Sequence, residues 1–406
     1  MDVSTLRDEA KDILSEAVAL RRTLHSWPEL GNHLPATRET VCESLDNLPV
    51  DLTLHETTSG IAAVLEGGRP GHTVLLRADM DALPMPEDTG LDFASKVDGA
   101  MHACGHDAHT AMLVGAAKLL SARKADIPGR VLFMFQPGEE GFGGAKFMLE
   151  EGLLNLGHRA DGTESPVTGA YALHITSSLP AGFIAAKGGP MMASSDSMVI
   201  RVKGRGGHAS QPHLALDPIP VACEMVQALQ LMVTRSVDVF DPSVVTIARI
   251  TAGTTSNVIP EVAEIEGTIR AVSERTRTKV VDGLRRVVEG IASAHGCEVT
   301  IEYHNGYPVT VNDVNGAEFS MNVAKELIGE QQVLRMPNPV MGAEDFSYVL
   351  NQVPGSMMFL GATPHGTDPF AAAPNHSNRV YFEEDAMVNG MAVYAGMALR
   401  HLSGSR

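Results

Sequence analysis

The stretch HTVLLRA (residues 72–78) is a short, nearly continuous run of apolar side chains, and Asp79 and Asp81 follow it closely. Such a run is typical of a strand that is covered on both faces of a parallel sheet. The segment AHTAMLVGAAKLLSA (108–122) has helical spacing. Three further runs share the strand pattern: GIAAVLE (60–66), RVLFMFQ (130–136) and GAYALHI (169–175). Strands that alternate with helices predict an α/β domain, with a mostly parallel sheet and helices on both faces.

From about residue 195 the pattern changes to strand, helix, two strands, helix and strand. This order is the ferredoxin-like split βαβ arrangement, which can fold as a unit of its own. The chain therefore predicts an α/β domain in two pieces, 1–191 and 307–406, interrupted by an inserted α+β domain at 192–306. The segments behind this interpretation are SMVIRVKG (197–204), DPIPVACEMVQALQLMVTR (217–235), PSVVTIARI (242–250), VAEIEGTIRAV (262–272), SERTRTKVVDGLRRVVEGIASAHG (273–296) and CEVTIEYH (297–304).

The charge and composition of the chain exclude several classes of protein. Its 406 residues carry 31 Lys and Arg against 49 Asp and Glu, a net charge of −18. This balance argues against binding to nucleic acid or to an anionic membrane, since both need clustered cations. No stretch approaches the roughly 18 apolar residues of a membrane span, and the acidic N-terminus is unlike a signal peptide. Four widely spaced cysteines make a disulfide framework improbable, so we expect a cytoplasmic protein.

The segment MHACGHDAH (101–109) places one cysteine among three histidines. Cys104 could be half of a disulfide, a redox thiol, a nucleophile, a metal ligand or an inert buried side chain. Composition disfavours the disulfide, and no C-x-x-C redox motif is present. A nucleophile would need a histidine base and an orienting group, for which local sequence is weak evidence. Because His106 stands two residues away, and carboxylates follow neighbouring strands, ligation of zinc or a similar divalent metal is the favoured role.

Other polar side chains are expected at the same edge of the sheet. Glu139 and Glu140 follow RVLFMFQPG, and His174 lies near the end of GAYALHI. Because ligands gather beyond the carboxyl ends of strands in open α/β sheets, these groups should converge with Cys104. One glutamate could then bind metal while the other acts as general base toward a metal-bound water. The chemistry implied is hydrolysis of an amide or an ester.

Six motifs occur in order across nearly the whole chain, and together they resemble the M20 metallopeptidase family. The resemblance is to its amidohydrolase branch, which includes hippurate hydrolases, N-acyl-amino-acid aminoacylases and auxin-conjugate hydrolases. The paired-glutamate turn contains Gly138 and Phe142, and ITSSLPAG follows His174, where the family usually has other residues, so the substrate stays open. The motifs are LRADMDALPM (76–85), MHACGHDAHTAML (101–113), QPGEEGFGGA (136–145), GRGGHASQPH (204–213), NVIPEVAEIEGTIR (257–270) and MGAEDFS (341–347).

The resemblance implies a role for each matching residue. It implies Glu139 as general base and Asp81 as the residue that orients a ligand imidazole. In the inserted domain it implies that His208 reaches the site of a neighbouring subunit, and that Asn257 and Arg270 form a pair that binds the substrate's carboxylate or oxyanion. The implied ligands of two divalent ions, zinc or manganese, are Cys104, His106, Glu140, His174 and His376.

The sequence therefore predicts a metal-dependent amidohydrolase that cleaves the N-acyl amide bond of a small N-acyl-amino acid. The resemblance implies a homodimer, with a tetramer also open, in which the inserted domain mediates dimerisation and acts as a lid. The nearest alternative is a dipeptidase or carboxypeptidase on the same scaffold. Two further alternatives are a binding protein without activity, for which we find no lost ligand or base, and a thiol-dependent hydrolase with Cys104 as nucleophile.

Overall fold

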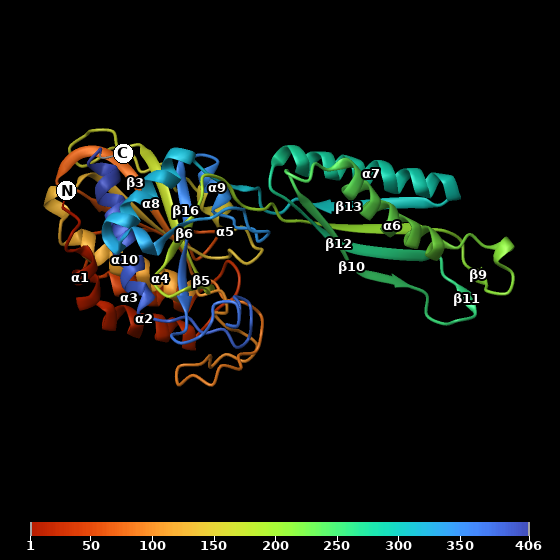
Figure 1. Cartoon of the computed structure of the whole chain (residues 1–406), viewed down its shortest axis with the longest axis horizontal. Coiled ribbons are helices and arrows are strands. Elements are labelled where there is room, and N and C mark those ends of the chain that lie inside the picture. Colours follow the sequence, from red (N-terminus) through yellow and green to blue (C-terminus); the bar gives the residue numbers. More distant parts are fainter. Residues whose placement is uncertain (1, 405–406) are drawn as a thin grey trace. The chain divides into compact units, whose positions relative to one another are not determined.

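The computed structural model describes residues 2–404, and the chain divides into two compact units. Unit 2 consists of Pro190–Thr310 together with the short return Pro339–Glu344, which the sequence did not indicate. Unit 1 comprises the rest of the chain: everything before unit 2, Val311–Asn338, and everything from Asp345 onward. Figure 1 labels the elements of both units, and each unit is described by itself below.

Unit 1 is built on an eight-stranded sheet whose central strands are parallel. The order is β1-β2-β4-β3-β5-β16-β6-β15, and β4, β3, β5 and β16 run parallel to one another. The expected α/β class is therefore confirmed. The strands are β1 (Asp51–Leu54), β2 (Ile61–Glu66), β3 (Arg69–Asp79), β4 (Pro128–Gln136), β5 (Val167–Pro180), β6 (Ile184–Ala186), β15 (Val333–Arg335) and β16 (Gly355–Thr363). Two short strands, β7 (Gly189–Met192) and β14 (Thr310–Asn312), lie where the units meet in the sequence.

Two almost wholly buried helices, α4 (His106–Ser121) and α10 (Ala386–Leu402), pack against β3. Both are apolar around most of their circumference, as a helix inside a core must be. Tyr394 of α10 fixes this packing, since its hydroxyl donates to the carbonyl of Arg77 at 2.6 Å. The other helices are α1 (Leu6–Asp12), α2 (Leu14–Ser26), α3 (Pro35–Leu45), α5 (Gly144–Glu150), α8 (Val314–Ile328) and α9 (Ser347–Leu350), with 3-10 turns at Lys124–Asp126 and Glu330–Gln332.

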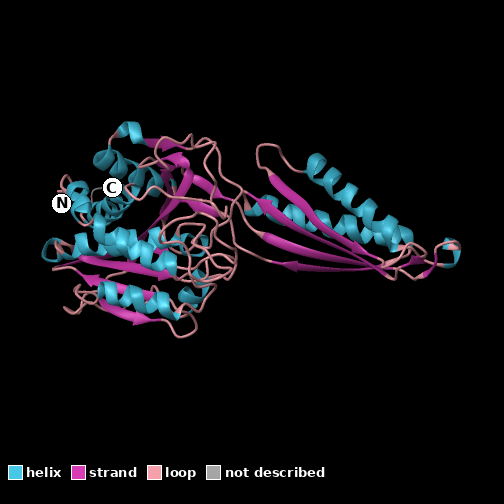
Figure 2. Cartoon of the chain, turned by 90° about the horizontal axis from the view of Figure 1, so that it is seen from below, coloured by secondary structure: helices cyan, strands magenta, loops and turns pink. Residues whose placement is uncertain are grey.

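Unit 2 has the split βαβ order that the sequence predicts. Figure 2 shows its helices lying along its sheet. Its antiparallel sheet has the order β10-β12-β8-β13, and α6 and α7 pack against each other and against this sheet. Buried and partly exposed residues alternate along β12, so one sheet face forms the core. The elements are β8 (Asp196–Lys203), α6 (Pro218–Ser236), β10 (Ser243–Ala252), β12 (Val262–Ala271), α7 (Glu274–His295) and β13 (Glu298–His304), with a small ladder of β9 (Gly207–His208) and β11 (Val258–Ile259) and a 3-10 turn at Pro212–Leu214.

None of the helices in residues 2–404 combines the length and the apolar character that a membrane crossing requires.

Candidate metal centre

The polar residues expected at one edge of the sheet of unit 1 do lie there. Strand β3 ends at Asp79, with Asp81 just beyond it, and β4 ends shortly before Glu139 and Glu140. Helix α4 begins at His106, immediately after Cys104. Its N-cap, Gly105, has φ +84°, and a Cβ there would stand only 2.3 Å from Ile175, so this entry to the helix requires glycine. The chain thereby presents Cys104 and His106 beside the carboxyl ends of the central strands.

Two groups of donor atoms share the sulfur of Cys104. One contains Cys104, His106 and His174, the other Cys104, Glu140 and His376, and within each group the donor atoms lie within 4.8 Å of one another. Cys104 Sγ is 3.4 Å from His174 Nε2 and 3.3 Å from His376 Nε2. His376 Nε2 is also 3.2 Å from Glu140 Oε1. The five residues that the sequence predicts as ligands therefore converge, with the thiol between the two groups.

His376 reaches this position through an unusual backbone conformation. Its φ is +68°, the one positive value of a residue other than glycine in the part of the chain that the structure describes. Such a conformation costs of order 1–3 kcal/mol and persists where surrounding contacts enforce it. The amide of His376 donates to the carbonyl of Ala103 at 2.9 Å, which ties the C-terminal loop to the segment of Cys104. This backbone conformation turns the imidazole of His376 toward the thiol of Cys104.

Asp81 holds the paired-glutamate turn in place. One carboxylate oxygen accepts the amide of Glu139 and the other accepts the amide of Glu140, both at 3.0 Å. Asp81 Oδ1 is also 3.4 Å from His106 Nδ1. Glu139, Glu140 and His106 form a further group whose donor atoms lie within 4.8 Å of one another. Asp81 therefore contacts both the turn and an imidazole, rather than only closing its own turn.

The donor set fits a divalent metal ion. A thiolate, imidazoles and carboxylates are the ligands that zinc and similar borderline metals prefer. Both ring nitrogens of His106 are buried and make no hydrogen bond among the described residues. Contacts with Cys104 and Glu140 raise the pKa of His376 to about 10, against the opposing effect of burial. A cluster that stabilises a positive charge on an imidazole is also suited to a cation held between its donors. All four cysteines of the chain are free.

A buried ion-pair network lies beneath these donors, and the sequence reasoning missed it. Asp79 accepts from Arg77 at 2.7 Å and from His109 at 2.5 Å, contacts that the sequence did not indicate. Burial alone would raise the pKa of Asp79, but Arg77, His106 and His109 together hold it well below its usual range. Arg77 could have indicated this network from the sequence, because an arginine inside an apolar strand needs a buried counter-ion.

A second buried network supports the other side of the same segment. Asp107 accepts from Arg21 at 3.1 Å and from His25 at 2.8 Å, and both partners come from α2. Glu87 is 3.3 Å from the other ring nitrogen of His25. Burial opposes the charged form of His25, but these two carboxylates raise its pKa to about 9. The segment of Cys104 is therefore anchored by residues from a helix far away in sequence.

The residues predicted in the inserted domain are not all brought together within one chain. His208 pairs with Val258 in the β9–β11 ladder, which places it next to Asn257. Arg270 lies near the far end of β12, about 26 Å from that strand's start at roughly 3.3 Å per residue. One chain therefore does not bring Asn257 and Arg270 together, and their joint role in substrate binding stays a prediction.

Arg270 nevertheless has the environment of a binding residue. Its guanidinium has no hydrogen-bond or ion-pair partner among residues 2–404, and burial lowers its pKa against the effect of Asp196. A half-buried arginine without a partner is costly, so a bound anion would stabilise it.

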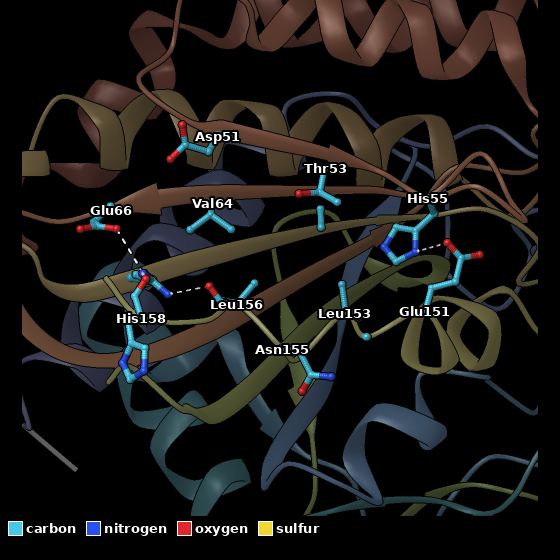
Figure 3. A pocket seen from close by; sticks show the side chains of 13 residues that line it. Asp51, Thr53, His55, Val64, Glu66, Glu151, Leu153, Asn155, Leu156 and His158 are labelled. Carbon is cyan, nitrogen blue, oxygen red and sulfur yellow. Dashed lines mark hydrogen bonds and ion pairs between the residues drawn. The ribbon is translucent and has the colours of Figure 1, made fainter. Parts of the chain in front are cut away.

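A separate hollow of about 350 Å³ lies against β1, β2 and β4 of unit 1 (Figure 3). Several of its polar side chains already have partners: His55 Nδ1 is 3.2 Å from Glu151, and Arg130 is 3.3 Å from Glu66. None of its lining residues is a predicted site residue. The donor cluster at the carboxyl ends of the strands therefore remains the candidate site.

The chain is similar in sequence to a known protein family and to several characterised proteins. Residues 75–400 match the model of Peptidase family M20/M25/M40. The chain is 38% identical over 402 residues to "Thermostable carboxypeptidase 1" of Saccharolobus solfataricus, covering 98% of each protein. It is 37% identical over 383 residues to "N-acetylcysteine deacetylase" of Bacillus subtilis, covering 94% of this chain and 96% of that one.

The chain also has the same fold as a solved structure of a metal-binding protein. The YxeP protein of Bacillus subtilis, described as a dinuclear metal binding peptidase, superimposes with a TM-score of 0.81 at 32% sequence identity. The match covers 97% of this chain and 99% of the other.

Proposed function

The chain belongs to peptidase family M20/M25/M40 and is a hydrolase of amide bonds, and from this premise we propose that it removes the acyl group from a small N-acyl-amino acid. The observation that carries the proposal is the convergence of a thiol, imidazoles and a carboxylate next to the turn of Glu139, which Asp81 holds in place. The alternative of a binding protein without activity would need a lost ligand or base, and each expected residue is present. The amino acid and the acyl group stay open.

We propose that the donor cluster would hold two divalent ions, zinc or manganese. The residues that would hold them are those of the two groups of donor atoms, Cys104, His106, His174, Glu140 and His376. Bound there, the metal would supply Lewis acidity, which lowers the pKa of water to about 7 and polarises the carbonyl of the amide.

Glu139 is the proposed general base. Its carboxylate takes a proton from the attacking water and later passes it to the nitrogen of the leaving amine. The fixed turn supports this role, because Asp81 holds the amides of Glu139 and Glu140 at 3.0 Å each. A base held within hydrogen-bond reach of the reacting atoms contributes about 10²–10⁴ in rate. The neighbouring glutamate is then left to bind metal.

We further propose a homodimer, with a tetramer also open, in which unit 2 is the dimerisation and lid domain. Since Asn257 precedes β12 and Arg270 lies near the far end of that strand, one active site would take Arg270 from its own chain and His208 and Asn257 from a second copy. Arg270 would bind the carboxylate of the substrate through its planar fork. His208 would stabilise the charge that develops on the carbonyl oxygen.

A carboxypeptidase or dipeptidase is the second candidate function. The observation that favours it is the 38% identity to a protein named as a thermostable carboxypeptidase over 98% of both chains. Both reactions break an amide bond next to a free carboxylate, so Arg270 would serve either one. The two functions differ in what stands on the acyl side of the bond.

The proposal is tested with metal-depleted and metal-restored protein. Chelation should abolish activity and zinc or manganese should restore it, whereas retained activity after metal removal would support the thiol-dependent alternative. A panel of N-acetyl and N-benzoyl amino acids is then compared with dipeptides of the same C-terminal residue. Faster turnover of the N-acyl-amino acids supports the proposal, and faster turnover of the dipeptides supports the peptidase. Action in the cytoplasm stays a prediction.

A further inference from the structure

His109 is a fully buried histidine of α4 that the proposed function leaves without a role. It lies three residues after His106, and the two rings stack with their centroids 5.4 Å apart. The ring of His174 meets it edge-on at 4.8 Å. His109 therefore touches two proposed ligands at once, from the side of the protein core.

The hydrogen bonds of His109 decide which ring nitrogen carries the proton. The amide of Ile175 can only donate, and it lies 2.6 Å from His109 Nε2, so this nitrogen accepts. The proton of the ring is therefore on Nδ1, which donates to Asp79 Oδ1 at 2.5 Å. Because both ring nitrogens are committed, His109 has no lone pair for a metal, although it lies in a group of potential donors with Asp79 and His106.

Asp79 is itself held from the opposite side. Arg77, two residues earlier on β3, donates to Asp79 Oδ2 at 2.7 Å, and Thr110 donates to the carbonyl of Asp79 at 2.8 Å. These side chains are fully buried, where water cannot replace a lost partner. The carboxylate of Asp79 is thus held in one orientation, and its contact with Nδ1 fixes the orientation of the His109 ring.

The residue whose amide His109 contacts, Ile175, also orients His174 through its carbonyl, in the next peptide group along the chain. The carbonyl of Ile175 accepts from His174 Nδ1 at 2.8 Å and from Asn375 at 3.0 Å. With Nδ1 donating, the lone pair of His174 is on Nε2, the atom that faces Cys104 Sγ at 3.4 Å. The amide of Ile175 is therefore fixed by His109, and its carbonyl is fixed by His174 and Asn375.

We propose that His109 is a positioning residue, which fixes the backbone of Ile175 at its amide and, through the adjoining carbonyl, the direction in which His174 Nε2 faces the metal centre. The chain of contacts is Arg77, Asp79, His109 and the backbone of Ile175. This inference rests on the proposed function in one respect, that His174 is a ligand. Partners that orient ligands in this way commonly change metal affinity by about 10- to 100-fold when they are removed.

The experiment compares H109L with H109Q and with a matched control, H401L. His401 is buried and uses both ring nitrogens, on Thr168 at 2.9 Å and Tyr171 at 3.0 Å, which belong to the same strand β5 as His174. H401L therefore removes one buried and one partly buried hydrogen bond from β5 without touching the backbone of Ile175. A glutamine at 109 offers one donor and one acceptor, so it can replace both bonds of the ring.

The readouts are zinc affinity, by competition with a chelator, and the visible spectrum of the cobalt-substituted protein. H109L should bind zinc about 10- to 100-fold more weakly and show an altered cobalt spectrum. H109Q should recover most of the affinity, and H401L should lose stability while binding zinc as the unsubstituted protein does. If H109L does not fold, H109M, which adapts better to a buried space, takes its place against H109Q.

Two outcomes separate this inference from the proposed function. If H174A weakens zinc binding but H109L binds zinc as tightly as H401L does, the positioning role is overturned and the metal site stands. If H174A leaves zinc affinity unchanged, His174 is not a ligand, and both the proposed ligand set and the inference built on it fail. Equal zinc affinities of H109Q and H109L would also overturn the inference, because the hydrogen bonds would then not matter.

Discussion

The predicted metal ligands of unit 1 and the predicted substrate-binding residues of unit 2 differ in how their side chains are held. In unit 1 the donors are mostly buried, and ion pairs such as Arg77 with Asp79 lie beneath them. In unit 2, His208 is exposed on a short two-stranded ladder beside the exposed Asn257, and the side chain of Arg270, far along β12, has no ion-pair partner among residues 2–404. One region is preorganised by its own chain, and the other is not.

This difference indicates where the two regions obtain their geometry. Buried charges are costly without a partner, so unit 1 pairs the charged groups beneath its donors, such as Arg77 and Asp79, within the fold. Exposed polar groups are satisfied by water until a ligand or another chain arrives. We therefore expect substitutions in unit 1 to change chemistry or metal binding outright, and those in unit 2 to act through substrate binding and assembly. The following predictions test that division.

The largest effect is expected at the general base. Replacing Glu139 with glutamine should lower kcat by about 10²–10⁴-fold, because an amide cannot accept the proton of the attacking water. Metal content should be unchanged, since the neighbouring Glu140 still binds. The matched variant E140Q should instead lose metal, measured by elemental analysis of the purified protein. Full activity of E139Q would show that another group is the base.

The next test addresses the exposed end of unit 2 and the second copy. H208A should lose roughly 10²–10³-fold in kcat, as expected for removal of one group that stabilises an oxyanion. When H208A and E139Q chains are co-expressed, about a quarter of the sites in a random mixture of dimers should regain both residues and recover activity. Mixtures that stay as inactive as their components would mean that each chain uses its own His208.

A pH dependence of stability is expected from the network beneath the metal segment. The carboxylates of Asp107 and Glu87 raise the pKa of His25 from 6.5 to about 9, against burial. The folded state therefore binds more protons than the unfolded state between these values. The stabilisation that protonated His25 contributes is fully present below pH 6.5 and is lost as the pH rises to about 9. The free energy of unfolding should fall by about 3 kcal/mol across this window.

The measurement for His25 is the free energy of unfolding of the metal-loaded protein from pH 6 to pH 9.5. Stability should fall across this window more steeply than in H25Q, which cannot gain the proton. Parallel pH profiles of the two proteins would contradict a charged His25 and leave Asp107 with Arg21 as its only cationic partner.

The smallest effect is expected at Arg270. Replacement by lysine removes the planar fork but keeps the charge, and should raise KM roughly 10-fold with little change in kcat. An amidated substrate, which has no carboxylate, should be cleaved equally by R270K and the unsubstituted protein. R249A serves as the control, because Arg249 lies on the same sheet in an exposed ion pair with Glu266 and such pairs contribute little. Equal effects of R270K on both substrates would remove the carboxylate-binding role.

Much of the site could be predicted because its residues sit at places that local pattern identifies. The strands of unit 1 were recognisable from apolar runs, and their carboxyl ends then located Cys104, Glu140 and His174. The order of elements in unit 2 followed from periodicity in the same way. Strand β5 nevertheless extends to Pro180, beyond the expected end. Spacing and propensity act between neighbours in the chain, so the sequence displays them directly.

The contacts that orient the site were decided by tertiary structure alone. Arg77 and Asp345 are 268 residues apart yet form a buried contact of 3.3 Å, and His109 meets the amide of Ile175 from 66 residues away. The same is true of the separation of Asn257 from Arg270, which depends on the direction of β12. Which partners meet is set by the order of strands in a sheet and by the packing of helices on it. A sequence therefore reveals which groups need a partner, and only the packed fold determines which partner each one receives.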